Sequence, residues 1–248
     1  YQVEYHQVGD ATVNTTSSLV DSVLVSGLTS STSYQFRVRG ICGTETTLWS
    51  AWTSFTTAMC PNSTIAYSYD DSTMTAGTSN FAPIGYSYYD YGFVQTLIDS
   101  AQLAALGGDI TAMAFNSVDG NQGSMFTNMD IYLANVSETS LSDFIIPDST
   151  HNFVQVLTAG DLTYTDGGWH TFVLDTNFAW DGHSNILVTV NRGHGDYGMG
   201  ANFRTHSTST AHTVYAYRDG TSYDFASLAS VYAYTGNFVG DLQLIACI

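Results

Sequence analysis

The sequence contains no lysine, and its basic residues are five arginines set against 22 aspartates and glutamates. The formal net charge is −17 at pH 7. A chain this acidic repels phosphate groups, so nucleic acid and anionic membrane surfaces are disfavoured as partners. Only Glu4, Glu45 and Glu138 are glutamates, and aspartate suits turns because its short side chain hydrogen-bonds nearby backbone. The pattern indicates a loop-rich acidic surface. We expect no cofactor, and calcium is an open alternative that no motif supports.

Long apolar runs are also missing. No segment approaches the roughly 18 consecutive apolar residues of a membrane-spanning helix, so we expect no membrane insertion. Hydrophobic residues nevertheless make up 44% of the chain, enough to fill the core of one large or two ordinary domains. The chain opens directly in strand-like sequence, so we expect a mature or excised fragment.

Cysteine is scarce, and the three cysteines, Cys42, Cys60 and Cys247, have neither CxxC nor zinc-site spacing. Cys60 and Cys247 bracket the larger segment of the chain, and the terminal strands of a sandwich are often neighbours. We therefore predict a Cys60–Cys247 disulfide, which implies an oxidising compartment. Cys42 is left over, and its partner stays open.

Alternation of apolar and polar residues runs through most of the chain and predicts strands. The clearest case is 167–190, GGWHTFVLDTNFAWDGHSNILVTV, where two strands flank a corner at Asp181-Gly182. The second of these strands alternates between two faces, with Ile186, Val188 and Val190 on one and Leu187 and Thr189 on the other.

One short helix is predicted, over 96–106, TLIDSAQLAAL. Leu97, Ala101 and Ala104 share a face at helical spacing, and Gly107-Gly108 would end the helix. A single helix among many strands predicts an all-β chain.

Residues 1–59 carry the first family resemblance. The run YQVEY…SGLTSSTSYQFRVRGICG…LWSAWTSFTT resembles the second half of a fibronectin type III domain. Leu28 and Tyr34 match that family's tyrosine corner, in which the tyrosine hydroxyl bonds back to the backbone before its strand. A full domain of this family begins with two further strands. We therefore expect this partial domain to be completed by upstream residues or by a strand from a neighbouring subunit.

Residues 60–248 carry a second resemblance, strongest at 167–190 and weaker at DITAMAFN and MDIYLANV. They are similar to a β-sandwich module of secreted Bacteroidetes proteins, related to the cleaved-adhesin, jelly-roll-like domains of type IX secretion cargo. The resemblance implies a secreted, surface-exposed accessory module. It supplies no catalytic residue to carry over.

The sequence does not contain a catalytic or metal-binding motif in the context that such a motif requires. Gly193 to Gly198 fits GxGxxG, but the following residues show no helical face to receive a pyrophosphate. His194, His206 and His212 are close in sequence, with Asp196 nearby, yet no pair has metal-ligand spacing. The nucleophile elbow GxSxG is also absent. We predict neither an enzyme nor a metal site.

The densest aromatic patch runs from Tyr86 to Phe93. Its candidate ligand-binding residues are Tyr86, Tyr88, Tyr89, Asp90 and Tyr91. Aromatic faces stack on the C–H surfaces of sugars while carboxylate oxygens accept from hydroxyls, so the patch suits a carbohydrate. The alternative is that these tyrosines pack between two sheets with their hydroxyls satisfied.

Together these patterns predict two tandem β-sandwiches, a partial fibronectin type III domain at 1–59 and a jelly-roll-like domain with one short helix at 60–248. The predicted function is a non-catalytic adhesive or structural module of a secreted or cell-surface bacterial protein, self-assembling through strand completion. Its partner would be a glycan or a neighbouring protein subunit. The alternative is a carbohydrate-binding accessory module of a secreted hydrolase or protease.

Overall fold

The computed structural model describes residues 1–248 except 24, 26–27, 30–31, 44, 58–62, 87, 119–123, 165, 196–200 and 248. The chain divides into two compact units, Tyr1–Pro61 and Asn62–Ile248. The described residues are almost entirely β, as the sequence predicts: they form strands β1 to β19 and one short 3-10 helix, Leu228–Ser230.

The first unit is built on one antiparallel sheet in the order β2-β1-β3-β6. Its strands are β1 (Gln2–Gln7), β2 (Asn14–Ser17), β3 (Ser33–Arg39) and β6 (Thr53–Thr56), and β4 (Ile41–Cys42) pairs with β5 (Glu45–Thr46). One face is apolar, because Val3 lies opposite Val38 and Tyr5 opposite Phe36. Of the residues that the structure describes in this unit, only Val3 and Tyr34 are buried. The apolar face is therefore thinly covered.

Tyr34 makes the backbone contact expected from its position. Its hydroxyl accepts a hydrogen bond from Thr29 N at 3.1 Å, which ties the start of β3 to the preceding turn. The contact agrees with a tyrosine corner, while membership of the fibronectin type III family stays a prediction.

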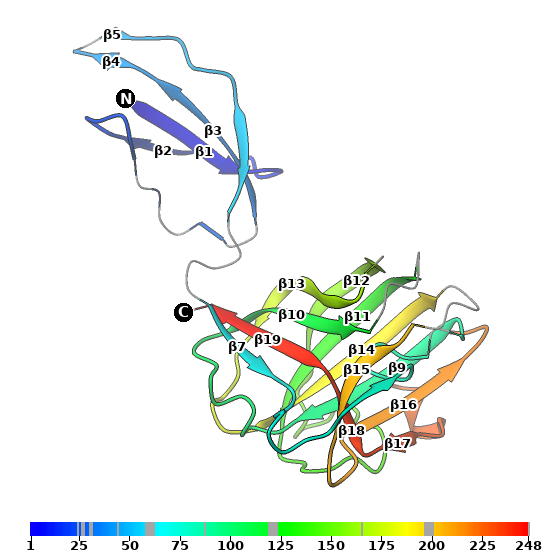
Figure 1. Ribbon diagram of the computed structural model, residues 1–248. Helices are drawn as coiled ribbons and strands as arrows, with labels where there is room; N and C mark the ends of the chain where they lie inside the picture. The colour runs from blue at the N-terminus through cyan, green and yellow to red at the C-terminus, as the bar shows by residue number, and fades with distance from the viewer. Residues whose placement is uncertain are drawn as a thin grey trace. The chain divides into compact units, whose positions relative to one another are not determined.

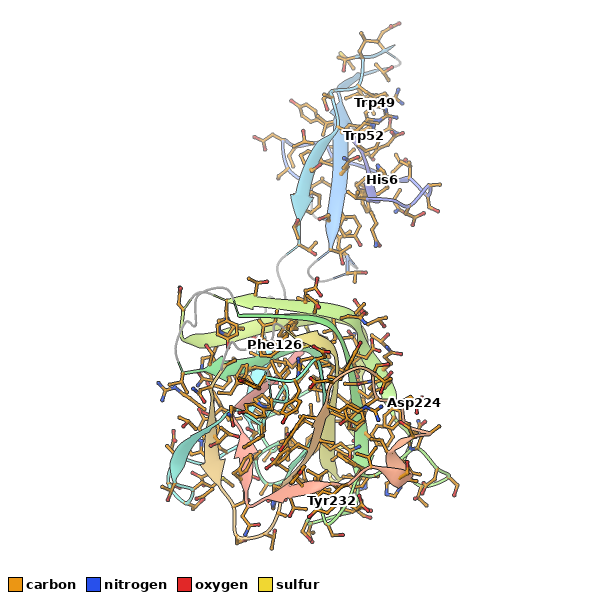
Figure 2. All side chains as sticks on the ribbon, turned by 90° about the vertical axis from the view of Figure 1, so that its right-hand side faces the viewer. His6, Trp49, Trp52, Phe126, Asp224 and Tyr232 are labelled. Carbon is orange, nitrogen blue, oxygen red and sulfur yellow. The ribbon has the colours of Figure 1, made fainter. Side chains whose placement is uncertain are left out.

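The opposite face of the same sheet carries a ladder of arginines and tryptophans. The Arg37 guanidinium lies 4.6 Å from the Trp52 ring and 4.9 Å from that of Trp49, and Arg39 lies 4.5 Å from Trp49. His6 meets Trp52 edge-on at 4.8 Å, and Figure 2 shows Trp49, Trp52 and His6 in that order along the sheet. Cation–π stacking of this kind holds the two tryptophans against the sheet.

The second unit is a sandwich of two antiparallel sheets (Figure 1). The seven-stranded sheet contains β7 (Ser63–Tyr67), β8 (Ala76–Ser79), β10 (Ile110–Ser117), β13 (Gly168–Phe178), β15 (Phe203–Ser207), β18 (Phe238–Gly240) and β19 (Leu242–Cys247). The six-stranded sheet has the order β12 (Val154–Tyr164), β11 (Ser124–Val136), β14 (Asn185–Gly195), β9 (Tyr91–Ile98), β16 (Thr213–Arg218), β17 (Tyr234–Gly236).

The main core lies between these sheets, and β14 shows how alternation builds it. Ile186, Val188 and Val190 point into the main core. Leu187 points to the other side, into an outer cluster that also contains Leu141. The two faces predicted for this strand are confirmed. The outer cluster covers the second face of the six-stranded sheet, so that its central strands are buried on both sides.

The corner before β14 connects the two sheets, since β13 belongs to one and β14 to the other. Gly182 has φ +81, a conformation that glycine adopts without steric cost. The Asp181 carboxylate accepts hydrogen bonds from the backbone of His183 at 3.0 Å and Ser184 at 2.8 Å. A short acidic side chain thus fixes the turn.

The helix predicted over 96–106 is wrong. Thr96, Leu97 and Ile98 complete β9, which pairs with β14 on one side and β16 on the other. Leu97 lies in the outer cluster and Ile98 in the main core, so the strand is apolar on both faces. A short run of this kind shows no strand alternation, and periodicity alone does not separate it from a buried helix. Turns follow it, including Gln102 N to Asp99 O at 3.0 Å.

Candidate functional site

Eight aromatic rings gather at the edge of the six-stranded sheet in the second unit. Tyr215 and Tyr217 lie two residues apart on β16 and so share a face, and Tyr234 on β17 pairs directly opposite Tyr215. The segment between β8 and β9 covers that face with further aromatic residues. We call the set the tyrosine surface: Phe81, Tyr86, Tyr88, Tyr89, Tyr215, Tyr217, Tyr232 and Tyr234.

The rings of the tyrosine surface are in direct contact. Tyr217 and Tyr234 are parallel, with centroids 5.4 Å apart. Tyr89 lies 4.5 Å from Tyr217, and Phe81 stacks on Tyr215 at 4.7 Å. These separations are those at which aromatic pairs attract. Three segments distant in sequence therefore form one continuous array.

Part of the array is open to solvent. Tyr88 is 43% exposed, Tyr234 is 41% exposed and Tyr232 is 75% exposed, and Figure 2 shows Tyr232 at the periphery of the unit. Burial, followed by the Tyr234 hydroxyl, raises the pKa of Tyr217 to about 12, and burial also raises the pKa of Tyr215. Both hydroxyls keep their protons at neutral pH and so can donate a hydrogen bond to a ligand.

A buried arginine holds the tyrosine-bearing loop from beneath. Arg192, on β14, is fully buried. Its Nη2 donates to the carbonyl oxygens of Tyr86 at 2.9 Å and Tyr89 at 2.8 Å, and its Nη1 donates to that of Asp90 at 3.2 Å. The guanidinium also lies 5.4 Å from the ring of Phe126, which lies inside the unit (Figure 2). Burial lowers the pKa of Arg192 to about 10, so the group remains cationic at neutral pH.

Gly92 makes room for this arginine. A Cβ at Gly92 would lie 3.3 Å from both Nε and Nη2 of Arg192, which is tighter than an ordinary contact. The conformation of the loop therefore depends on the bulky guanidinium of Arg192 and on the lack of a Cβ at Gly92.

The structure separates the five residues proposed from the sequence. Tyr86, Tyr88 and Tyr89 belong to the tyrosine surface. Asp90 faces a neighbouring turn instead, where its backbone N–H donates to the Asp219 carboxylate at 3.2 Å. Tyr91 begins β9 and packs on the other side of the sheet, against the cluster of Phe93, Ala216, Tyr223 and Leu228. Tyr91 is already in the strand and shares the face of Phe93 two residues on, whereas Tyr86, Tyr88 and Tyr89 lie in the loop before it.

The histidines do not converge. His206 lies between two carboxylates, with Nδ1 2.7 Å from Asp241 and Nε2 2.9 Å from Asp71. His212 bonds instead to Asp99, with Nε2 3.1 Å from Oδ2. The side chain of His194 and all of Asp196 lie outside the described residues. Among the residues that the structure does describe, no group of three or more candidate ligands is placed to hold a metal ion.

The predicted disulfide is not tested, because Cys60 lies outside the described residues. Its pairing with Cys247 stays a prediction. Cys42 is free and exposed.

Comparison with known proteins adds no relative. No family model matches the chain, and neither a curated protein nor a solved structure shows significant similarity to it. Within the described part of the chain, no helix is long and apolar enough to cross a membrane.

Proposed function

We propose that this chain is a non-catalytic adhesive module of an exported protein and that its second unit binds glycan through the tyrosine surface. The observation that carries the proposal is a contiguous array of rings that includes three solvent-exposed ones, Tyr88, Tyr232 and Tyr234, and of which the loop part is anchored by Arg192. Open ring faces pack on the C–H faces of sugars, and the tyrosine hydroxyls bond the sugar hydroxyls. Apolar area with a few fixed polar groups is the usual composition of a small-molecule site.

The chemistry of the surface favours binding over catalysis. The raised pKa values of Tyr215 and Tyr217, due first to burial, make these phenols poor bases at neutral pH. What they offer a ligand is hydrogen bonding and stacking area. The lack of lysine and the net charge of −17 also favour a neutral ligand over a phosphorylated or sulfated one.

The test is a glycan array with the wild-type chain and the double variant Tyr88→Ala, Tyr89→Ala. We expect glycan binding to fall by about tenfold or more, since exposed aromatic anchors carry a large share of binding energy. Tm should fall only modestly, because Tyr88 is exposed and Tyr89 is part-buried at the edge of the sheet. Tyr1→Ala is the matched control, since Tyr1 is also an exposed tyrosine but lies in the first unit.

A large fall in Tm with unchanged binding would assign these rings to the core and contradict the proposal. If the chain is an accessory module of a secreted hydrolase or protease, the same surface serves it. The surrounding reading frame distinguishes that alternative, because a catalytic domain would stand beside this chain.

A second candidate function is self-assembly through the first unit. Its apolar sheet face borders a groove of about 340 Å³ whose lining includes Val3, Val20, Val23, Phe36 and Val38. An apolar sheet face needs a covering layer, and a strand donated by a neighbouring copy would supply one. Sedimentation of the wild-type chain should then show association that Val38→Asp abolishes. A wild-type chain that stays monomeric at high concentration would contradict assembly.

A further inference from the structure

A second group of aromatic side chains lies on the outer face of the seven-stranded sheet. Tyr67 on β7 and Trp169 on β13 meet edge-to-face with ring centroids 5.9 Å apart. Tyr69 lies 5.6 Å from Tyr67. Across the sheet, Tyr67 pairs with Gln243 and Trp169 with Asn116, on strands joined through β10 and β19. The aromatic pair is thus positioned by the sheet.

These rings form one side of a groove of about 560 Å³. The groove is lined by Tyr67, Tyr69, Asp70, Asp71, Ala101, Gln102 and Trp169. Tyr67 is 40% exposed, and Trp169 is half-buried, so the rings remain accessible from the groove. Its volume suits a ligand of one to a few sugar rings.

The carboxyl and amide groups lining the groove are rich in acceptors. The Oε1 atom of Gln102 is buried and has no hydrogen-bond partner among the described residues. A buried acceptor without a donor is unfavourable, and because Gln102 lines the groove, a turn of its side chain toward the groove would let a ligand hydroxyl donate to this atom. Asp70 and Asp71 add carboxylate oxygens along the same groove.

The two carboxylates already have partners inside the protein. Asp70 accepts hydrogen bonds from the backbone N–H of Ser72 at 2.9 Å and from its hydroxyl at 2.6 Å. Asp71 lies 2.9 Å from Nε2 of His206. Each carboxylate retains lone pairs for a further donor, so the hydroxyls of a sugar can donate to both.

The side of the groove opposite solvent is rigid. Tyr69 stacks on His206 with centroids 4.0 Å apart and planes 3° apart, and His206 is fixed through Nδ1 to the buried Asp241 at 2.7 Å. A ligand would therefore meet side chains that already hold their bound positions, which lowers the entropy lost on binding.

We propose that this groove is a second saccharide site, separate from the tyrosine surface, that stacks a neutral sugar on Tyr67 and Trp169. The hydroxyls of that sugar donate to Gln102 Oε1 and to the carboxylates of Asp70 and Asp71. This site stands beside the proposed function and does not depend on it. β7 lies on one side of the unit in Figure 1, and β16 and β17 on the other.

The experiment titrates the full chain with neutral oligosaccharides, namely cellohexaose, xylohexaose and mannohexaose, by isothermal titration calorimetry. We expect at least one to bind, and Trp169→Ala to raise its Kd by about tenfold or more. Gln102→Leu, which keeps the size of the side chain but removes the acceptor, should weaken the same sugar while leaving Tm unchanged. Binding in the double variant Tyr88→Ala, Tyr89→Ala should persist at this site.

Three results would overturn the inference. The first is binding that is lost only in the double variant, which would leave the tyrosine surface as the sugar site. The second is tight, salt-sensitive binding of an oligolysine peptide that Trp169→Ala removes, since the groove would then be a cation site. The third is the absence of heat with all three oligosaccharides, together with glycan-array binding that does not change in Trp169→Ala or Gln102→Leu.

Discussion

Replacing Arg192 with methionine would remove the cation that holds the tyrosine-bearing loop. The wild-type guanidinium donates three hydrogen bonds to backbone carbonyls, those of Tyr86, Tyr89 and Asp90. Methionine is similar in length and flexible, so it fills most of the space beneath the loop. What the substitution removes is the donors, and three carbonyl oxygens lose their partner.

The expected loss follows from this geometry. Hydrogen bonds to a charged group contribute about 1.5–3 kcal/mol each, and burying a methionine side chain returns about 1.5–3 kcal/mol. For three bonds the net loss in the free energy of unfolding of the second unit is about 4 kcal/mol, within the range of about 3–5 kcal/mol for removing one partner of a buried charged contact. Since the loop carries Tyr86, Tyr88 and Tyr89, glycan binding at the tyrosine surface should fall as well.

The assay is equilibrium unfolding in urea, followed by near-ultraviolet circular dichroism, for Arg192→Met and for a matched control, Arg218→Met. Arg218 also donates to two loop carbonyls, those of Thr221 and Ser222, and lies 4.0 Å from an aromatic ring, that of Tyr223. It is only partly buried, so water replaces its bonds and we expect a loss of about 1 kcal/mol. Equal losses for the two variants, or an Arg192→Met protein as stable as wild type, would refute the reasoning.

Three further predictions concern other parts of the chain. The hydrogen bond to Asp99 raises the pKa of His212, so this pair contributes fully below about pH 6 and its contribution is lost as the pH rises through the folded-state pKa. The stability difference between wild type and Asp99→Asn should shrink from about pH 6 to pH 9, and a constant difference would contradict the pairing. Tyr34→Phe should lower the free energy of unfolding of the first unit by about 1 kcal/mol, because the hydroxyl that accepts from Thr29 N is lost. An unchanged midpoint of urea unfolding would show that this hydrogen bond does not stabilise the unit. The Cys60–Cys247 disulfide should contribute about 4 kcal/mol; thiol titration of the unfolded, unreduced chain should find one thiol, and three would disprove the bond.

The alternation of apolar residues in β14 predicts the burial of Arg192 as well as that of its aliphatic residues. The inward positions of β14 are confirmed for Ile186, Val188 and Val190. Continuing the same two-residue step reaches Arg192, which is indeed buried. The signal for the buried cation was therefore present, as an arginine in register with a core face. Net charge alone does not distinguish Arg192 from the other four arginines.

The tyrosine surface could be predicted only in part from the sequence, because its rings come from segments that are distant in the chain. The patch around Tyr86, Tyr88 and Tyr89 was recognisable because its residues are adjacent. Their partners Tyr215 and Tyr217 lie more than 100 residues away, and only the pairing of β9 with β16 brings them together. The alternation in Tyr215-Ala216-Tyr217 predicts that the two rings share a face, but nothing in one sequence says which loop covers them. The helix at 96–106 failed for a related reason, since a strand buried on both faces loses the alternation that identifies it.

The use of arginine in this chain bears on what the protein can bind. Four of its five arginines lie over aromatic rings: Arg37 and Arg39 over tryptophans, Arg192 over Phe126 and Arg218 over Tyr223. Arg37 and Arg39 also donate to side-chain oxygens, and Arg192 and Arg218 donate to backbone carbonyls. A guanidinium held in this way serves as an internal tie, and it is not available to attract an anionic ligand. With no lysine to take that role, and with the exposed Arg204 in neither proposed site, the recognition that we propose uses ring faces, hydroxyls and carboxylates. Those groups bind neutral molecules rich in hydroxyls, which is why both the tyrosine surface and the Tyr67–Trp169 groove point to sugars.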